Sequence, residues 1–228
     1  MTANTCDTSM TLPPVATRWQ SNEVAQNYDQ ERFSSLLGRL FNYLSQRAFR
    51  RALKSVRNEL DVVIDLPCGT GRATAVVRQF ASRVMGADIS TAMMTQAAKR
   101  LGKAGPLSFV ATDVTHQPFP DNAIPCVTSI RFMMHLDQDS RRAALKEMAR
   151  VSKRYVIIEY GYTTLWLKLR RAVKRLLLTL WGKKTTFVRA VAWNDITDDL
   201  TQANLELVRY YPTARGLSES VVLLLAKK

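Results

Sequence analysis

The sequence is poor in cysteine and lacks long apolar runs. Its three cysteines, Cys6, Cys68 and Cys126, are widely spaced and form no Cys-x-x-Cys pair. Neither a disulfide framework nor a zinc site is predicted, and no metal is expected. The first twenty residues lack the basic and apolar segments of a secretory signal, and no apolar run approaches the roughly 18 residues of a membrane-spanning helix. We therefore expect a cytoplasmic protein, either soluble or peripheral on the inner face of a membrane.

Acidic residues are also scarce. The 228-residue chain has 33 lysines and arginines against 19 aspartates and glutamates, which gives a net charge of +14. Such an excess favours contact with phosphate-rich surfaces, either nucleic acid or anionic lipid. With 46% hydrophobic residues, the chain is long enough for one sizeable domain.

Strands and helices are predicted to alternate along most of the chain. Residues 1–20 are polar and interrupted by two prolines, which predicts a mobile tail, and residues 21–228 are expected to form the domain, with helices in 21–58. Strands are predicted at 61–66, 83–90, 107–114, 125–134 and 154–160, helices at 71–81, 91–102, 140–151 and 195–204, and a terminal hairpin at 205–212 and 219–228. This order implies an α/β fold with a Rossmann-like, doubly wound sheet of about seven strands. The sheet is expected to be mostly parallel, with a C-terminal antiparallel hairpin and helices on both faces.

A glycine loop follows the first predicted strand in "VVIDLPCGTGR", residues 62–72. Gly69 and Gly71 lack side chains, so the backbone could approach a ligand closely, next to the start of a helix. Asp65, Asp88 and Asp113 end the first three predicted strands. Because the carboxyl ends of parallel strands share one edge of a sheet, these carboxylates are expected to converge there.

Several phrases of the sequence resemble the class I S-adenosylmethionine-dependent methyltransferases, particularly the small-molecule branch of the ubiquinone and menaquinone pathways. They are "VIDLPCGTGR", "GADISTAMM", "TDVTHQPFPDNAIPCV", "LKEMARVSKRYVIIEY" and "VAQNYDQERF". The resemblance covers roughly residues 22–160. It implies S-adenosyl-L-methionine as cofactor and in-line methyl transfer to a small-molecule or lipid-like acceptor.

The resemblance also implies roles for individual residues. Asp65 and the glycine loop would hold the methionine part of the cofactor, Asp88 the ribose hydroxyls, and Asp113 with the Val114 backbone the adenine edge. Ile89 and Met93 would line the adenine, and residues 128–131 would pass beneath the sulfonium. The implied cofactor-binding residues are Asp65, Pro67, Gly69, Thr70, Gly71, Asp88, Ile89, Met93, Asp113, Val114 and Ser129.

Two positions depart from the family pattern. Pro67 replaces the first glycine, which removes an amide donor and predicts an extended entry to the turn. Cys126 stands where an aspartate is frequent, and we assign it no chemistry. A dinucleotide oxidoreductase competes for the same loop. However, Thr74 occupies the last position of a Gly-x-Gly-x-x-Gly pattern, and no tyrosine is followed by lysine four residues later.

The acceptor side is less defined. His135, in "RFMMHLDQDS", is the candidate catalytic base, or else a residue packed at the start of the next helix. Arg131 could orient an anionic acceptor or pair with a carboxylate. Glu159 and Tyr160 end the fifth predicted strand and are further acceptor candidates, and Tyr28 could close over the cofactor.

Residues 165–184 carry seven basic residues and no acidic one. On a helical wheel one face carries Leu165, Leu169, Val173, Leu176 and Leu180, with Trp166 beside them, and the opposite side carries Lys168, Arg171, Lys174 and Arg175. Two interpretations remain open: a lid packed on the domain, or a helix lying in an anionic membrane interface. The second would suit a membrane-embedded acceptor.

An RNA methyltransferase or RNA-binding protein is the alternative function, suggested by the net charge. The fourth strand ends in "SIRFMM" and lacks the motif used to methylate exocyclic amines of bases, so nucleic acid is not the expected acceptor. A catalytically idle cofactor-binding protein is a third interpretation, which the three aspartates argue against.

Overall fold

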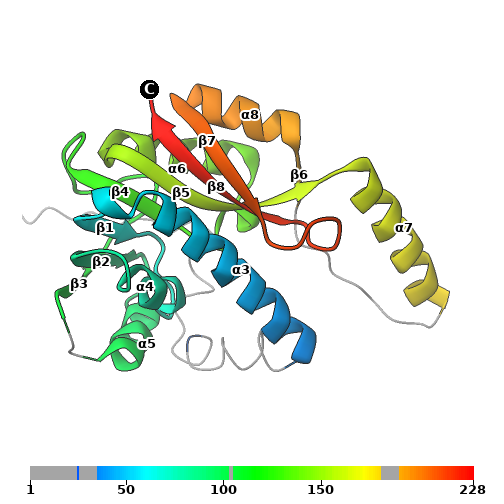
Figure 1. Ribbon diagram of the computed structural model, residues 1–228, viewed down its shortest axis with the longest axis horizontal. Coiled ribbons are helices and arrows are strands. Elements are labelled where there is room, and N and C mark those ends of the chain that lie inside the picture. The colour runs from blue at the N-terminus through cyan, green and yellow to red at the C-terminus, as the bar shows by residue number, and fades with distance from the viewer. Residues whose placement is uncertain (1–24, 26–34, 103–104, 181–189) are drawn as a thin grey trace, which may run out of the picture.

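The computed structural model describes residues 25, 35–102, 105–180 and 190–228, and element labels follow Figure 1. The strands are β1 (Val62–Asp65), β2 (Arg83–Asp88), β3 (Leu107–Ala111), β4 (Ile124–Ser129), β5 (Ser152–Thr163), β6 (Val191–Ala192), β7 (Leu205–Pro212) and β8 (Ser220–Lys227). The helices are α3 (Leu36–Ser55), α4 (Arg72–Val77), α5 (Thr91–Leu101), α6 (Gln138–Val151), α7 (Leu165–Leu180) and α8 (Trp193–Gln202), with 3₁₀ turns η2 (Arg57–Glu59) and η3 (Met133–His135). No helix in this described part of the chain is both long and apolar enough to cross a membrane.

The strands form an eight-stranded sheet in the order β3-β2-β1-β4-β5-β8-β7, with β6 paired to β5. Strands β1 to β6 pair in parallel, whereas β8 is antiparallel to both β5 and β7. This confirms the predicted mostly parallel sheet with a C-terminal antiparallel hairpin. The short β6 is an addition that the sequence did not indicate.

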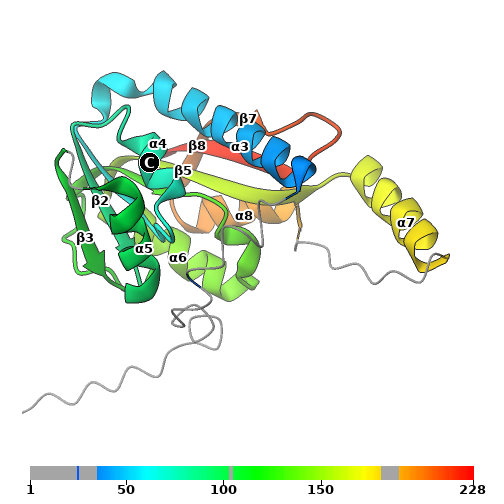
Figure 2. The ribbon, with the colours of Figure 1, turned by 90° about the horizontal axis from the view of Figure 1, so that it is seen from below.

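Helices cover both faces of the sheet. Helices α3 and α4 pack on one face through residues such as Phe49, Leu53 and Val77, and α6 and α8 pack on the other through Leu145 and Ile196. Figure 2 shows α3 on one side of the strands and α6 and α8 on the opposite side. Both faces of the central strands are therefore buried, which explains their continuous runs of valine and isoleucine.

The order of the strands fixes where a ligand can enter. The chain runs outward from β1 to β2 and β3, then returns to place β4 on the other side of β1. In an open parallel sheet, the crevice beyond the carboxyl ends of the strands at such a reversal is the usual binding site. Here the reversal falls between β1 and β4, and the glycine loop follows β1 at the same end of the sheet.

The fourth strand is shorter than the sequence predicted. The expected strand over 125–134 ends at Ser129, and Met133–His135 form a 3₁₀ turn instead. Arg131 adopts a positive φ of 62°, which no strand residue can have, so the chain turns there. The side chains of Met133 and Met134 are buried, whereas Arg131 and His135 are partly exposed.

Candidate functional site

The glycine loop makes a tight turn between β1 and α4. The peptide bond between Leu66 and Pro67 is cis, and Gly69 and Gly71 have φ values of 51° and 78°. A β-carbon at Gly71 would lie 2.9 Å from the Cβ of Ala97, so this glycine is needed for packing against α5. At Gly69 a β-carbon would meet nothing within 4 Å, because the residue faces open space.

Asp88 connects the loop to the end of β2. Its carboxylate accepts hydrogen bonds from the amides of Gly69, at 2.8 Å, and Ser90, at 2.9 Å. A carboxylate has about four lone-pair sites, so Asp88 can accept a hydrogen bond from a ligand as well. Burial raises the pKa of Asp88, against the lowering effect of these backbone hydrogen bonds. Ser90 caps α5 as predicted, accepting from the Met93 amide.

Asp65 lies deeper than the sequence suggested. Its fully buried carboxyl group accepts hydrogen bonds from the hydroxyls of Thr74, at 2.6 Å, and Thr128, at 3.1 Å. Burial raises the pKa of Asp65 to about 7, although both hydroxyls act to lower it. The side chain therefore ties β1 to α4 and β4, and it does not line the cavity described next.

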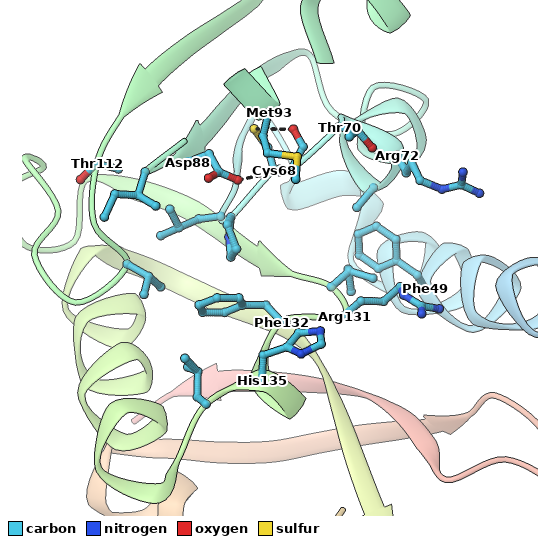
Figure 3. A pocket seen from close by; sticks show the side chains of 18 of the residues that line it. Phe49, Cys68, Thr70, Arg72, Asp88, Met93, Thr112, Arg131, Phe132 and His135 are labelled. Carbon is cyan, nitrogen blue, oxygen red and sulfur yellow. Dashed lines mark hydrogen bonds between the residues drawn. The ribbon is translucent and has the colours of Figure 1, made fainter. Parts of the chain in front are cut away.

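A cavity of about 250 Å³ opens at the carboxyl ends of β1, β2 and β4 (Figure 3). Most of the predicted cofactor-binding residues line it: Pro67, Gly69, Thr70, Asp88, Ile89, Met93, Asp113 and Val114. Asp65, Gly71 and Ser129 do not. Buried Cys68 also contributes to the wall, and burial raises the pKa of its thiol, which favours the uncharged form. The cavity thus combines carboxylates with an apolar surface, as a nucleoside ligand requires.

Asp113 follows β3 and holds the next turn in place. Its Oδ1 accepts hydrogen bonds from the Thr115 amide, at 2.7 Å, and hydroxyl, at 2.8 Å. This turn places Val114 in the cavity wall. The carboxylate therefore fixes the turn that contributes Val114 to the cavity wall.

Arg131 and His135 lie on the opposite side of the cavity from Asp88 and Met93 (Figure 3). Both follow β4, on the turn that replaces the predicted end of that strand. His135 is partly exposed and lies beside Phe132. Its imidazole is thus at the cavity rather than in the core.

Glu159 and Tyr160 are separated by the sheet. Adjacent side chains on a strand point to opposite faces. Glu159 faces α3 and lines a second cavity, and it accepts hydrogen bonds from Ser45 of α3 and Ser220 of β8. Tyr160 faces α6 and α8, where its hydroxyl donates to Asp199 at 3.3 Å. Tyr160 is fully buried and lines neither cavity, so it does not lie where the sequence predicts an acceptor.

Helix α3 supplies a wall of the cavity that the sequence did not indicate. Asn42, Ser45, Gln46 and Phe49 all line it. They recur at spacings of three and four residues, which places them on one helix face. That spacing was visible in the sequence, but nothing there indicated which partner this face meets. Tyr28, the predicted closing residue, lies outside the described residues.

Comparison with known proteins agrees with this geometry. Residues 63–154 match the family described as methyltransferase domain. Over 148 residues the chain is 32% identical to the demethylmenaquinone methyltransferase of Thermobifida fusca, covering 62% of this chain and 59% of that protein. Over 142 residues it is 35% identical to the ubiquinone/menaquinone biosynthesis C-methyltransferase of Pseudomonas paraeruginosa, covering 54% and 52%. The chain thus spans between half and three fifths of the length of these relatives.

A solved structure shows a similar fold. Magnesium protoporphyrin IX methyltransferase from Synechocystis, with bound S-adenosylhomocysteine, superimposes with a TM-score of 0.74 over 94% of this chain and 98% of that one, at 17% sequence identity. The resemblance predicted from the sequence phrases is therefore confirmed.

Proposed function

We propose that this chain is a class I S-adenosylmethionine-dependent methyltransferase that transfers a methyl group to a small-molecule or lipid-like acceptor. The observation that carries the proposal is the convergence of Gly69, Asp88 and Asp113 on one cavity at the reversal of the strand order. Overall charge was the observation behind the RNA alternative, and anionic lipid would account for it equally. We therefore do not propose RNA as the acceptor.

The residues of the cavity fit the cofactor. Asp88 can accept a hydrogen bond from the ribose, and Ile89, Met93 and Val114 offer an apolar surface for the adenine. Gly69 lines the cavity and adds no side chain to it. When bound, S-adenosylmethionine supplies an electrophilic methyl group on a sulfonium. Asp65 would act indirectly, by fixing β1, β4 and α4 through Thr74 and Thr128.

The remaining residues would position the acceptor and exclude water. Phe49 and Phe132 shield the cavity, which strengthens the electrostatic interactions within it. His135 would take a proton from a hydroxyl or a carbon acid of the acceptor, since a neutral imidazole is a suitable base near pH 7. Arg131 would orient an acceptor that carries negative charge.

The cofactor assignment makes a thermodynamic prediction. S-adenosylhomocysteine at about one hundred times its dissociation constant should raise the free energy of unfolding by about 2.7 kcal/mol. Asp88→Asn should weaken this binding at least tenfold, because the ribose loses a charged acceptor. Titration calorimetry and urea unfolding with and without the ligand measure both effects.

The control for that experiment is Asp61→Asn, which changes an exposed carboxylate at the opposite end of the sheet. It should bind S-adenosylhomocysteine as the wild type does. If the wild type binds none, the cofactor assignment is wrong. If Asp88→Asn binds normally, Asp88 has no ribose role.

Helix α7 supports a second proposal, that the protein associates with anionic membranes. Trp166, Leu169 and Val173 lie on one side of the helix at 50–61% exposure, while Leu167 is buried against the domain. Both views show α7 extending away from the sheet (Figures 1 and 2). A lid would pack its apolar side chains on the domain, whereas these three are exposed. An apolar stripe on a basic helix suits a lipid interface.

Flotation with liposomes tests this proposal. The protein should float with vesicles of 70% phosphatidylcholine and 30% phosphatidylglycerol at low salt, and much less at 0.5 M salt. Trp166→Ala/Leu169→Ala should reduce the floated fraction severalfold. The matched control, Val208→Ala/Tyr210→Ala, removes equally exposed apolar side chains from β7 and should float normally. Equal flotation of the two double variants would rule out α7 as the contact.

A further inference from the structure

A second cavity, of about 270 Å³, lies beside the first one, on the α3 side of β5. Its walls come from α3, β5, the first half of α7 and the connection between β7 and β8. The charged residues that line it are Arg131, Glu159, Arg170, Arg171 and Glu219. This charge pattern distinguishes it from the first cavity, where the carboxylates are aspartates at the strand ends.

Glu159 forms the floor of this second cavity. It is only 1% exposed, and the hydroxyls of Ser45, at 3.0 and 3.1 Å, and Ser220 donate hydrogen bonds to it. No basic side chain among the described residues forms an ion pair with it. A buried carboxylate held only by neutral hydroxyls is costly for folding. As a carboxylate it has lone pairs that those two serines do not use, so it can accept a hydrogen bond from a ligand.

The arginines of α7 give the cavity its positive wall. Arg171 forms an ion pair with Glu219, which fastens α7 to the connection before β8. Arg170, the residue before Arg171 in α7, is half-buried and has no ion-pair partner among the described residues. Its guanidinium is a donor that can bind a carboxylate or another anion in two-pronged geometry.

The two cavities meet at Ser45 and Arg131, since both residues line both of them. A molecule held in the second cavity could therefore present an atom to the first one beside Arg131. The second cavity is thus placed to hold an acceptor while the first holds the cofactor.

We infer that the second cavity is the acceptor pocket, and that it selects a small molecule carrying both a hydroxyl group, which donates to Glu159, and an anionic group, which binds Arg170. This inference rests on the proposed function and deepens it by naming the acceptor's chemical class. The dual requirement follows from the chemistry of the walls, because a glutamate carboxylate offers hydrogen-bond acceptors and an arginine guanidinium offers donors.

Three small aromatic probes test the two contacts separately. 4-Hydroxybenzoate has both groups, 4-hydroxybenzyl alcohol lacks the anion, and 4-methoxybenzoate lacks the phenolic donor. Their dissociation constants are measured by titration calorimetry on the full chain saturated with S-adenosylhomocysteine. 4-Hydroxybenzoate should bind at least about tenfold more tightly than either 4-hydroxybenzyl alcohol or 4-methoxybenzoate, because each contact involves a charged partner.

Variants assign each contact to its residue. Arg170→Ala should weaken both benzoates about tenfold and leave the benzyl alcohol unchanged. Glu159→Gln, which keeps the size of the side chain, should weaken both phenols and leave 4-methoxybenzoate unchanged. Lys168→Ala removes an exposed positive charge from the same helix without altering the cavity wall, and it should bind all three probes as the wild type does.

The pattern across variants decides the outcome. Equal affinity for the three probes, or equal losses in Arg170→Ala and Lys168→Ala, would overturn the inference, because binding would then reflect general charge. If the protein binds S-adenosylhomocysteine but none of the three probes, the inference is also overturned, while the proposed function remains intact. Failure to bind S-adenosylhomocysteine would instead contradict the proposed function.

Discussion

Asp199→Ala is expected to lower the free energy of unfolding by about 3–5 kcal/mol, because it leaves a buried arginine without its counter-charge. Asp199 is fully buried between α8, α6 and β5. It accepts hydrogen bonds from Arg141, at 2.9 Å, and Arg142, at 2.8 Å. Arg141 is itself only 4% exposed, so water cannot replace the lost carboxylate. Urea unfolding followed by circular dichroism measures the loss.

A comparison among three variants separates lost charge pairing from lost packing. Arg142→Ala should cost much less than Asp199→Ala, since its side chain is 26% exposed and the Arg141 pair remains. Arg141→Met/Asp199→Leu replaces the most buried pair with apolar groups, and it should be more stable than Asp199→Ala alone. If that double variant were the least stable of the three, the network would owe its effect to geometry rather than to an unpaired charge.

Tyr160 belongs to this network, which explains why sequence reasoning misplaced it. Its ring lies beside the Arg141 guanidinium, 5.9 Å from the centroid, and its hydroxyl donates to Asp199. Burial and the nearby Asp199 charge raise the pKa of Tyr160 and keep its hydroxyl protonated. The sequence predicts Glu159 and Tyr160 at the same place because both end the fifth predicted strand. Because side chains alternate along a strand, only one of these two residues can face the cavities. The sequence does not indicate on which face of the sheet the cavities lie.

The cofactor side was predictable because its residues are tied to strand ends. Asp88 ends β2 as expected, and the backbone direction of a parallel strand fixes where its last side chain lies. The glycine loop could be placed for the same reason. The cavity walls from α3 and α7 could not be predicted, because they depend on how helices from distant parts of the chain pack over the sheet. Ser45 and Glu159 are 114 residues apart in sequence and still hydrogen-bonded.

Asp65 shows a different limit of the sequence. Its position at the end of β1 was predicted, but its burial was not, because that depends on two threonines from other elements. Thr74 comes from α4 and Thr128 from β4, and their hydroxyls enclose the carboxyl group. A residue expected to face the ligand is therefore part of the support beneath it.

The raised pKa of Asp65 predicts that stability falls with increasing pH. The folded protein keeps this proton up to about pH 7, whereas the unfolded chain releases it near the ordinary value of 3.8. Because the folded state binds more protons between these values, the free energy of unfolding should decrease as pH rises from about 4 to about 7 and level off above that. A difference of about 3 pH units corresponds to about 4 kcal/mol.

Asp65→Asn isolates this effect, because asparagine has nearly the same shape and does not titrate. Wild type should lose about 4 kcal/mol relative to Asp65→Asn between pH 4 and pH 8, as measured by urea unfolding at each pH. Titrations of all other groups cancel in this difference. Asp61→Asn, which alters an exposed carboxylate one residue before β1, should give a profile parallel to that of the wild type. Parallel profiles for wild type and Asp65→Asn would mean that Asp65 is ionised in the folded protein, its charge held by the hydroxyls of Thr74 and Thr128 despite burial.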